Sequence, residues 1–214
     1  MTKAQAELII GSSLSDTAKM PCYSFNLSAL HCKTGSKLAN IKGSVCYGCY
    51  AMKGFYVMYD HINKMVPKTE KIDHPLWVPS MVYLINHQGN KKDSNYFRWH
   101  DSGDIQSLQH LDRICQVARR TPNVRHWIPT REYAIVKQYK QSHEIYGIKI
   151  PENLVIRLSA HMVDGDPPTG YGLPTSTVTR NGSRTCPAPD QGNKCLDCRA
   201  CWDPKVSNVA YGYH

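Results

Sequence analysis

Residues 95–107 read NYFRWHDSGDIQS, and this stretch decides the fold. Its first half is rich in aromatic residues, which is typical of a β-strand. Its second half contains Gly103 and several residues that commonly begin helices, and apolar residues then recur at helical spacing until Pro122. A strand that leads directly into a helix predicts one β-α unit.

The same unit repeats further along the chain. Residues 124–129 (VRHWIP) predict a second strand, 132–141 a second helix and 154–160 (LVIRLSA) a third strand. The strands recur at about 30 residues, the length of one β-α repeat. The fold class is therefore α/β, with a parallel sheet of β-α repeats. A complete TIM barrel needs about 250 residues, so the 214 residues of this chain predict a partial, TIM-like barrel.

We expect one domain over residues 1–214. Helices are also expected around 53–65 and 76–87, and the Gly- and Pro-rich stretch 164–174 is expected to be a loop. The domain divides into a loop-rich, cysteine-containing segment, a β-α repeat core and a cysteine-rich C-terminal segment, at residues 1–52, 53–163 and 164–214.

Composition narrows the class of protein. Charged residues make up 20% of the chain and hydrophobic residues 41%, which argues against disorder. The net charge of +9 makes nucleic acid a conceivable partner, but basic residues are dispersed rather than clustered. Thiolates or an anionic cluster would offset part of this charge. The N-terminus does not resemble a secretory signal and no stretch is apolar enough to span a bilayer, so we expect a reducing cytosol and no membrane partner.

The nine cysteines are the most unusual feature. Clustered cysteines in a reducing compartment indicate metal ligands or redox groups rather than disulfides. Four of them form the pattern C-x8-C-x2-C-x2-C near the C-terminus. Three cysteines at this close spacing with a remote fourth are typical of a [4Fe–4S] site, whereas zinc usually takes two separate C-x2-C pairs. The predicted ligands of this set are Cys186, Cys195, Cys198 and Cys201.

A second set lies near the N-terminus, where Cys32 precedes the pair Cys46 and Cys49. Three protein ligands on a [4Fe–4S] cluster would leave one iron open to a substrate or cofactor. Cys22 could be a fourth ligand, but its apolar-leaning surroundings favour packing, and Cys115 falls on the apolar face of a helix. An alternative is a single zinc ion that joins the two ends of the chain through Cys46, Cys49, Cys198 and Cys201.

Polar clusters follow each of the three strands. Sites in parallel α/β folds form at the carboxyl ends of strands, so these clusters predict a pocket. His100 and His161 could transfer protons, because histidine titrates near neutral pH, and the arginines could hold an anionic substrate. The candidate catalytic residues are His100, Asp101, Arg131 and His161; the candidate cofactor-binding residues are Ser102, Asp104 and Arg157. Asp104 could instead cap a helix, and Glu132 could be either functional or a turn residue.

Five segments resemble the phage-encoded gene product 88 family: GSVCYGCYAMKGFY, FRWHDSGDIQS, IPTREYAIV, VIRLSAHMVDG and CPAPDQGNKCLDCRACWD, at residues 43–56, 97–107, 128–136, 155–165 and 186–203. The resemblance runs from about residue 20 to the end of the chain. It implies a viral protein made in the cytoplasm of a bacterial host, with an iron–sulfur site. It implies no particular reaction.

The expected architecture is also similar to that of radical S-adenosylmethionine enzymes, which carry a C-x3-C-x2-C loop. Only the C-x2-C half is present here, at Cys46 and Cys49, with Cys32 further upstream. Ser102, Gly103 and Asp104 are the nearest candidates for contacts with S-adenosylmethionine.

Three hypotheses follow for function. The first is an iron–sulfur protein with redox or radical chemistry on a small molecule, served by an unidentified electron-transfer partner. The second is a zinc-stabilised module that binds nucleic acid through its basic, aromatic surface. The third is a structural phage protein in which a cluster only staples the fold.

Overall fold

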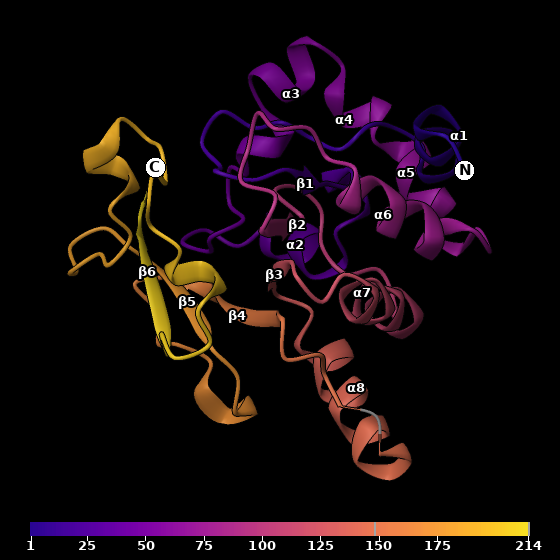
Figure 1. The fold of residues 1–214 in the computed structure, drawn as a ribbon. Coiled ribbons are helices and arrows are strands. Elements are labelled where there is room, and N and C mark those ends of the chain that lie inside the picture. The colour runs from indigo at the N-terminus through magenta and orange to yellow at the C-terminus, as the bar shows by residue number, and fades with distance from the viewer. Residues whose placement is uncertain (148, 214) are drawn as a thin grey trace.

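The computed structural model describes residues 1–147 and 149–213, and its centre is an open sheet of six parallel strands (Figure 1). The strands lie side by side in the order in which they occur along the chain, and each pairs with the next in parallel. The predicted α/β class with a parallel sheet is confirmed, and the sheet is not closed into a barrel. The strands are β1 (Ser24–Phe25), β2 (Tyr96–Trp99), β3 (Arg125–Thr130), β4 (Leu154–Val163), β5 (Thr175–Thr179) and β6 (Asn208–Gly212).

Helices cover one face of the sheet, with α6, α7 and α8 packed beside β1 to β4 (Figure 1). The alternation of side chains in a strand explains this arrangement. Phe97 and Trp99 of β2 point into the helical side and are fully buried, whereas Arg98 between them faces the opposite side. The helices are α1 (Lys3–Ile10), α2 (Lys33–Leu38), α3 (Phe55–Met58), α4 (His61–Lys64), α5 (Val66–Glu70), α6 (Trp77–Asn86), α7 (Leu108–Arg120) and α8 (Tyr133–Tyr146).

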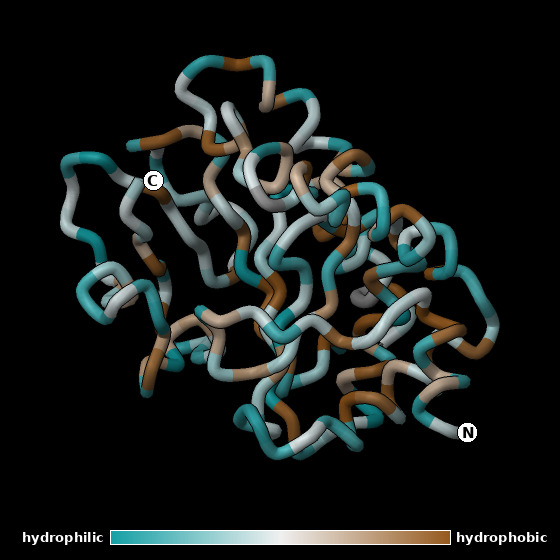
Figure 2. The backbone as a smooth tube through the Cα atoms, turned by 90° about the horizontal axis from the view of Figure 1, so that it is seen from above, coloured by the Kyte–Doolittle hydropathy of each residue, from teal (hydrophilic) through white to brown (hydrophobic). Residues whose placement is uncertain are grey.

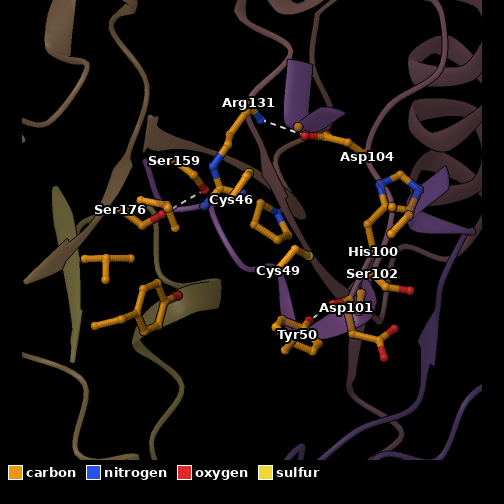
Figure 3. A pocket seen from close by; sticks show the side chains of 18 of the residues that line it. Cys46, Cys49, Tyr50, His100, Asp101, Ser102, Asp104, Arg131, Ser159 and Ser176 are labelled. Carbon is orange, nitrogen blue, oxygen red and sulfur yellow. Dashed lines mark hydrogen bonds between the residues drawn. The ribbon is translucent and has the colours of Figure 1, made fainter. Parts of the chain in front are cut away.

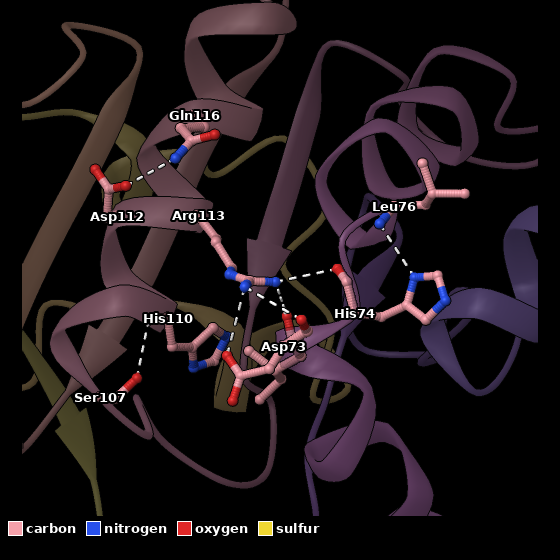
Figure 4. Close-up of polar contacts among 9 residues, drawn as sticks. Asp73, His74, Leu76, Ser107, His110, Asp112, Arg113 and Gln116 are labelled. Atoms are coloured by element: carbon pink, nitrogen blue, oxygen red, sulfur yellow. Dashed lines mark hydrogen bonds and ion pairs between the residues drawn. The ribbon is translucent and has the colours of Figure 1, made fainter.

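Helix α7 begins at a side-chain cap and is tied to the segment before α6 (Figure 4). The hydroxyl of Ser107 accepts a hydrogen bond from the backbone N–H of His110 at 3.0 Å, which satisfies one free donor of the first turn. The guanidinium of Arg113 donates to the carbonyls of Ile72, Asp73 and His74. These contacts fix α7 and therefore the loop that leads from β2 into it.

The opposite face of the sheet carries a smaller apolar cluster. Trp202, in the short 3₁₀ helix Ala200–Trp202, packs on Trp127 of β3 with ring centroids 5.1 Å apart, and Met20 and Cys22 complete the cluster. The cysteine-rich C-terminal segment is thereby docked onto the sheet. Seen from above in Figure 2, the backbone near the N-terminus is rich in hydrophobic stretches, whereas the loops near the C-terminus are mostly hydrophilic.

Several predicted elements differ from the structure. The expected helix 53–65 is wrong as a continuous element, because Gly54, with φ of 52°, delays its start and Asp60, with φ of 55°, separates α3 from α4. The helix predicted at 132–141 is longer, as α8, and the strand predicted at 154–160 extends to Val163 as β4. The strands β1, β5 and β6 and the helices α1 and α2 lie in segments for which only loops were expected.

No helix in the two described ranges is long and apolar enough to cross a membrane.

Candidate functional site

A cavity of about 790 Å³ lies against the face of the sheet that the helices leave free (Figure 3). Side chains from five strands line its wall, which extends to the residues that follow the carboxyl ends of β2 and β3. The strand residues on this wall include Arg98, Trp127, Ser159, Ser176, Val209 and Tyr211.

The cysteines fall into two groups, those that line this cavity and those that are buried away from it. Every cysteine that the sequence spacing nominates as a ligand borders it, although the two sets lie far apart in the chain. Cys22 is instead buried in the cluster around Trp127 and Trp202, and Cys115 is buried in the helical core. All nine cysteines fall within the described ranges and are free thiols. The cavity-lining cysteines are Cys32, Cys46, Cys49, Cys186, Cys195, Cys198 and Cys201.

The loop that carries Cys46 is attached to the end of β4. The N–H of Val45 donates to the carbonyl of His161 at 2.9 Å, and the N–H of Val163 donates to the carbonyl of Gly43 at 2.9 Å. A tight turn follows, in which the N–H of Cys49 donates to the carbonyl of Cys46 at 3.1 Å. This pairing brings an N-terminal loop to the carboxyl end of the fourth strand.

Cys32 stands at the start of α2, one turn before Gly35. A Cβ on Gly35 would lie 3.0 Å from the Cβ of Cys32, and 3.6 and 3.7 Å from the Sγ atoms of Cys32 and Cys46. The two sulfurs therefore both flank the space in which a side chain at position 35 would begin.

Glu132 fixes the first turn of α2 from across the cavity edge. Its carboxylate accepts hydrogen bonds from the backbone N–H of Thr34 at 2.8 Å and from the Thr34 hydroxyl at 2.9 Å. A carboxylate at the N-terminus of a helix satisfies its free donors. Glu132 thus positions Cys32 and is not among the residues that line the cavity.

The C-terminal set is held by contacts with two other segments, the one around Lys19 and strand β6. The N–H of Cys195 donates to the carbonyl of Lys19 at 3.0 Å, and the N–H of Cys186 donates to the carbonyl of Ala210 at 3.0 Å. The Sγ of Cys201 lies 3.1 Å from the hydroxyl of Tyr211 on β6. These contacts place four thiols along one side of the cavity.

Arg157, predicted from sequence to bind a cofactor, lies beneath this segment. Its guanidinium donates to the carbonyls of Thr175 and Val206, at 2.8 and 3.0 Å, and to those of Ala200 and Asp203, both at 3.1 Å. Arg157 is fully buried and is not among the residues that line the cavity. Its position is that of a clamp which ties the segment around Cys201 to the sheet.

Burial dominates the electrostatics of the thiols. It raises the pKa of Cys32 to about 12, with a further contribution from Asp104, and the pKa of Cys201 to about 11. The charge of Arg131 partly offsets the effect of burial on the pKa of Cys46. Metal binding at such thiols requires their deprotonation.

The thiols border a cavity rather than converge on one point. Among the residues that the structure describes, no group of three His, Cys, Asp or Glu side chains forms a ready site for a single metal ion. Iron–sulfur clusters take thiolate ligands, one at each iron of a [4Fe–4S] cluster. The cavity-lining thiols are therefore donors of the chemical kind that a cluster takes.

His100 has an unusual conformation at the end of β2. Its φ is 54°, a left-handed value that is costly for a residue other than glycine. The side chain is only 3% exposed, and within the described ranges neither ring nitrogen has a hydrogen-bond partner. Burial lowers its pKa well below the ordinary value, so the ring is neutral. His100 thus borders the cavity as a neutral ring whose two nitrogens are both buried.

Asp101 and Ser102 continue the cavity wall after His100. The Asp101 carboxylate accepts hydrogen bonds from Ser24 at 3.2 Å and Asn26 at 3.4 Å, and its carbonyl accepts one from the Tyr50 hydroxyl (Figure 3). The hydroxyl of Ser102 donates to the carbonyl of Leu27 at 2.8 Å. These bonds hold the wall against the segment that follows β1.

Asp104 does not cap α7, whose N-cap is Ser107. Its carboxylate instead accepts hydrogen bonds from the Thr130 hydroxyl at 2.6 Å, from the N–H of Arg131 at 2.9 Å and from its neighbour Ile105 at 2.8 Å. Burial raises the pKa of Asp104 to about 6. It therefore joins the ends of β2 and β3 at the cavity.

Arg131 and His161, the remaining candidate catalytic residues, differ in their position relative to the cavity. Arg131 lines the cavity, whereas His161 is not among the residues that line it. The His161 ring stacks on Tyr133 with centroids 4.4 Å apart, and its Nε2 lies 3.3 Å from the carbonyl of Arg131. His161 is thus placed to support Arg131 rather than to face the cavity.

Several polar residues on the wall were not predicted as site residues, among them Tyr50, Arg98, Ser176 and Tyr211. Arg98 carried a usable signal, because a charged residue in the middle of an aromatic strand must face away from the apolar core. Its guanidinium lies over the Trp127 ring at 4.9 Å. Ser176 and Tyr211 lie on strands that the sequence reading missed.

The comparisons with known proteins add one match. The family model described as Gene product 88 matches residues 1–204. No curated protein and no solved structure matches the chain.

Proposed function

The chain belongs to the gene product 88 family, and from this premise we propose that it is an iron–sulfur protein that performs redox or radical chemistry on a small molecule inside its cavity. One observation carries the proposal. The seven cysteines that sequence spacing nominates as ligands all border one cavity, and the two that it assigns to packing do not. We interpret the open sheet as an incomplete barrel whose inner face is the cavity wall.

Each cysteine set has its own role in this proposal. The four C-terminal cysteines would be the four protein ligands of one [4Fe–4S] cluster. Cys32, Cys46 and Cys49 would hold a second cluster, in which one iron has no protein ligand. Such clusters supply one-electron chemistry when they are bound. The space beside Gly35 and the thiol pair there support the second position.

The residues of the wall would handle the substrate. His100 is neutral and has two nitrogens without partners among the described residues, so one of them would hydrogen-bond a substrate that reaches it. Tyr50 and Asp101 fix the wall next to it. The surrounding loops and strands would exclude bulk water from the substrate.

Metal and sulfide analysis of protein purified without oxygen tests the proposal. About eight irons and eight sulfides per chain, with brown colour, are expected for two [4Fe–4S] clusters. Cys198→Ala and Cys46→Ala should each remove about half of the iron, whereas the matched control Cys115→Ala should remove none. Zinc without colour would contradict the proposal and favour a zinc-stabilised nucleic-acid-binding module.

Two further measurements separate the remaining alternatives. A change in the electron paramagnetic resonance spectrum on addition of S-adenosylmethionine would assign that cofactor to the open iron. Mass spectrometry of purified phage particles tests a structural role, since an enzyme of the infected cell need not be packaged.

A further inference from the structure

The cavity wall contains a guanidinium group whose charge has no partner among the residues that the structure describes. Arg131 lines the cavity, and Figure 3 shows its side chain directed toward Ser159 and Cys46. Within residues 1–147 and 149–213, its side chain makes no recorded hydrogen bond or ion pair, and its Nε is buried without a partner. Arg131 is only partly buried, so the rest of its guanidinium can reach an anionic ligand in the cavity.

The carboxylates near Arg131 are already engaged. Asp104 accepts three hydrogen bonds, one of which comes from the backbone of Arg131 rather than from its guanidinium. Glu132 accepts both of its hydrogen bonds from Thr34. Neither acid neutralises the guanidinium, which remains available to a ligand.

Two hydroxyl groups stand on the part of the cavity wall toward which the Arg131 side chain points (Figure 3). Ser159 on β4 and Ser176 on β5 are register partners, and the hydroxyl of Ser176 donates to that of Ser159 at 2.9 Å. Both residues are at most 5% exposed and both line the cavity. One bond between the two hydroxyls leaves the other hydroxyl hydrogen free to donate to a ligand.

We propose that Arg131, Ser159 and Ser176 form an oxyanion subsite that binds the carboxylate or phosphate group of a small organic substrate. The planar fork of a guanidinium matches both groups, and hydroxyl donors add direction. This proposal rests on the proposed function in one respect: it takes the bound anionic group to be part of the substrate. Its place beside Cys46 would put the rest of the molecule next to the N-terminal cysteine set.

Protection of Arg131 from phenylglyoxal, measured by peptide mass spectrometry, tests the subsite. Acetate and inorganic phosphate are the probes, acetamide is the uncharged comparison, and chloride keeps the ionic strength constant. Acetate or phosphate should slow modification of Arg131, and the more effective of the two identifies the group. Exposed Arg125 should react at the same rate throughout.

Variants make the test specific. Ser159→Ala should raise the half-protecting concentration about fivefold, the effect of losing one hydrogen bond, and Ser176→Ala should act in the same direction. Ser142→Ala on α8 is the matched control and should leave protection unchanged. Equal modification of Arg131 with chloride and with both probes would overturn the subsite.

Iron and sulfide content, measured on the same samples, separates the two proposals. Protection without iron would support the subsite and contradict the cluster. Clusters without protection would overturn the subsite alone.

Discussion

Glu132 accepts two hydrogen bonds from Thr34, a residue 98 positions earlier in the chain. This pair joins the end of β3 to the first turn of α2 and thereby sets the position of Cys32. Because Glu132 is only 6% exposed, water could not fully replace the two hydrogen bonds that Thr34 would lose on removal of this carboxylate.

Glu132→Ala is expected to lower the free energy of unfolding by about 2 kcal/mol, since hydrogen bonds to a charged group are lost and buried donors are left unpaired. Urea denaturation measures this change. The control Glu152→Ala, at an exposed position, should change stability by less than about 0.5 kcal/mol. Equal effects of the two variants would show that the Thr34 contact contributes nothing.

Gly103→Ala is expected to lower the free energy of unfolding by more than about 2 kcal/mol. The left-handed backbone would be strained with alanine, and the added Cβ would overlap with Leu27. Gly103 has φ of 77°, and an added Cβ would lie 2.6 Å from the Cβ of Leu27 and 2.9 Å from its carbonyl oxygen. Gly147→Ala is the matched control, with φ of 68° and no neighbour within 4 Å. It should cost only the backbone strain, about 1 kcal/mol, in the same thermal or urea unfolding experiment.

Stability should fall as the pH drops from 6.5 toward 3 because of His126. Its Nδ1 accepts from Trp99 and its Nε2 lies 2.8 Å from the Thr121 hydroxyl, and burial lowers its pKa to about 3. In this range the unfolded state binds a proton that the folded state excludes. At pH 5 this difference amounts to about 2 kcal/mol.

The variant His126→Phe isolates this effect. Between pH 7.5 and pH 5, the free energy of unfolding measured with urea should fall by about 2 kcal/mol more for the wild type than for the variant. Phe97→Leu perturbs the same part of the core without removing a titratable group, so its destabilisation should be equal at both pH values. A wild-type loss no larger than that of His126→Phe would refute the assignment.

Tyr211→Phe is expected to make the reduction potential of the C-terminal cluster more negative, if the proposed cluster is present. The Tyr211 hydroxyl lies 3.1 Å from the Sγ of Cys201, and hydrogen bonds to cluster sulfurs are one of the determinants of potential. A redox titration followed by electron paramagnetic resonance measures the shift. Tyr213→Phe, at a position 45% exposed, should leave the potential unchanged.

The sequence predicted the centre of the sheet because its signals are local. Strands β2, β3 and β4 are rich in aromatic or branched residues, and the two helices between them have clear ends. β5 (TSTVT) and β6 (NVAYG) are short and lie among Gly-, Pro- and Cys-rich turns, so tertiary pairing rather than local pattern makes them strands. β1 has only two residues and depends on its pairing with β2.

The candidate site was predictable to the same degree. Spacing nominated seven cysteines, but their common cavity depends on the pairing of Gly43 and Val45 with the end of β4, which no local pattern encodes. The pair Ser159 and Ser176 follows from strand register, and one of those strands was not predicted. The long-range partner of Glu132 was likewise invisible in the sequence.

Arg157 recognises the C-terminal segment only through main-chain oxygens. No side chain at positions 200, 203 or 206 takes part in these hydrogen bonds, so the residues there can be exchanged without loss of the bonds themselves. Positions 200, 203 and 206 are therefore replaceable as far as the contact with Arg157 is concerned, whereas Trp202 between them docks through its side chain. A redesigned loop of equal backbone course could dock on the same guanidinium and present a different set of ligands to the cavity.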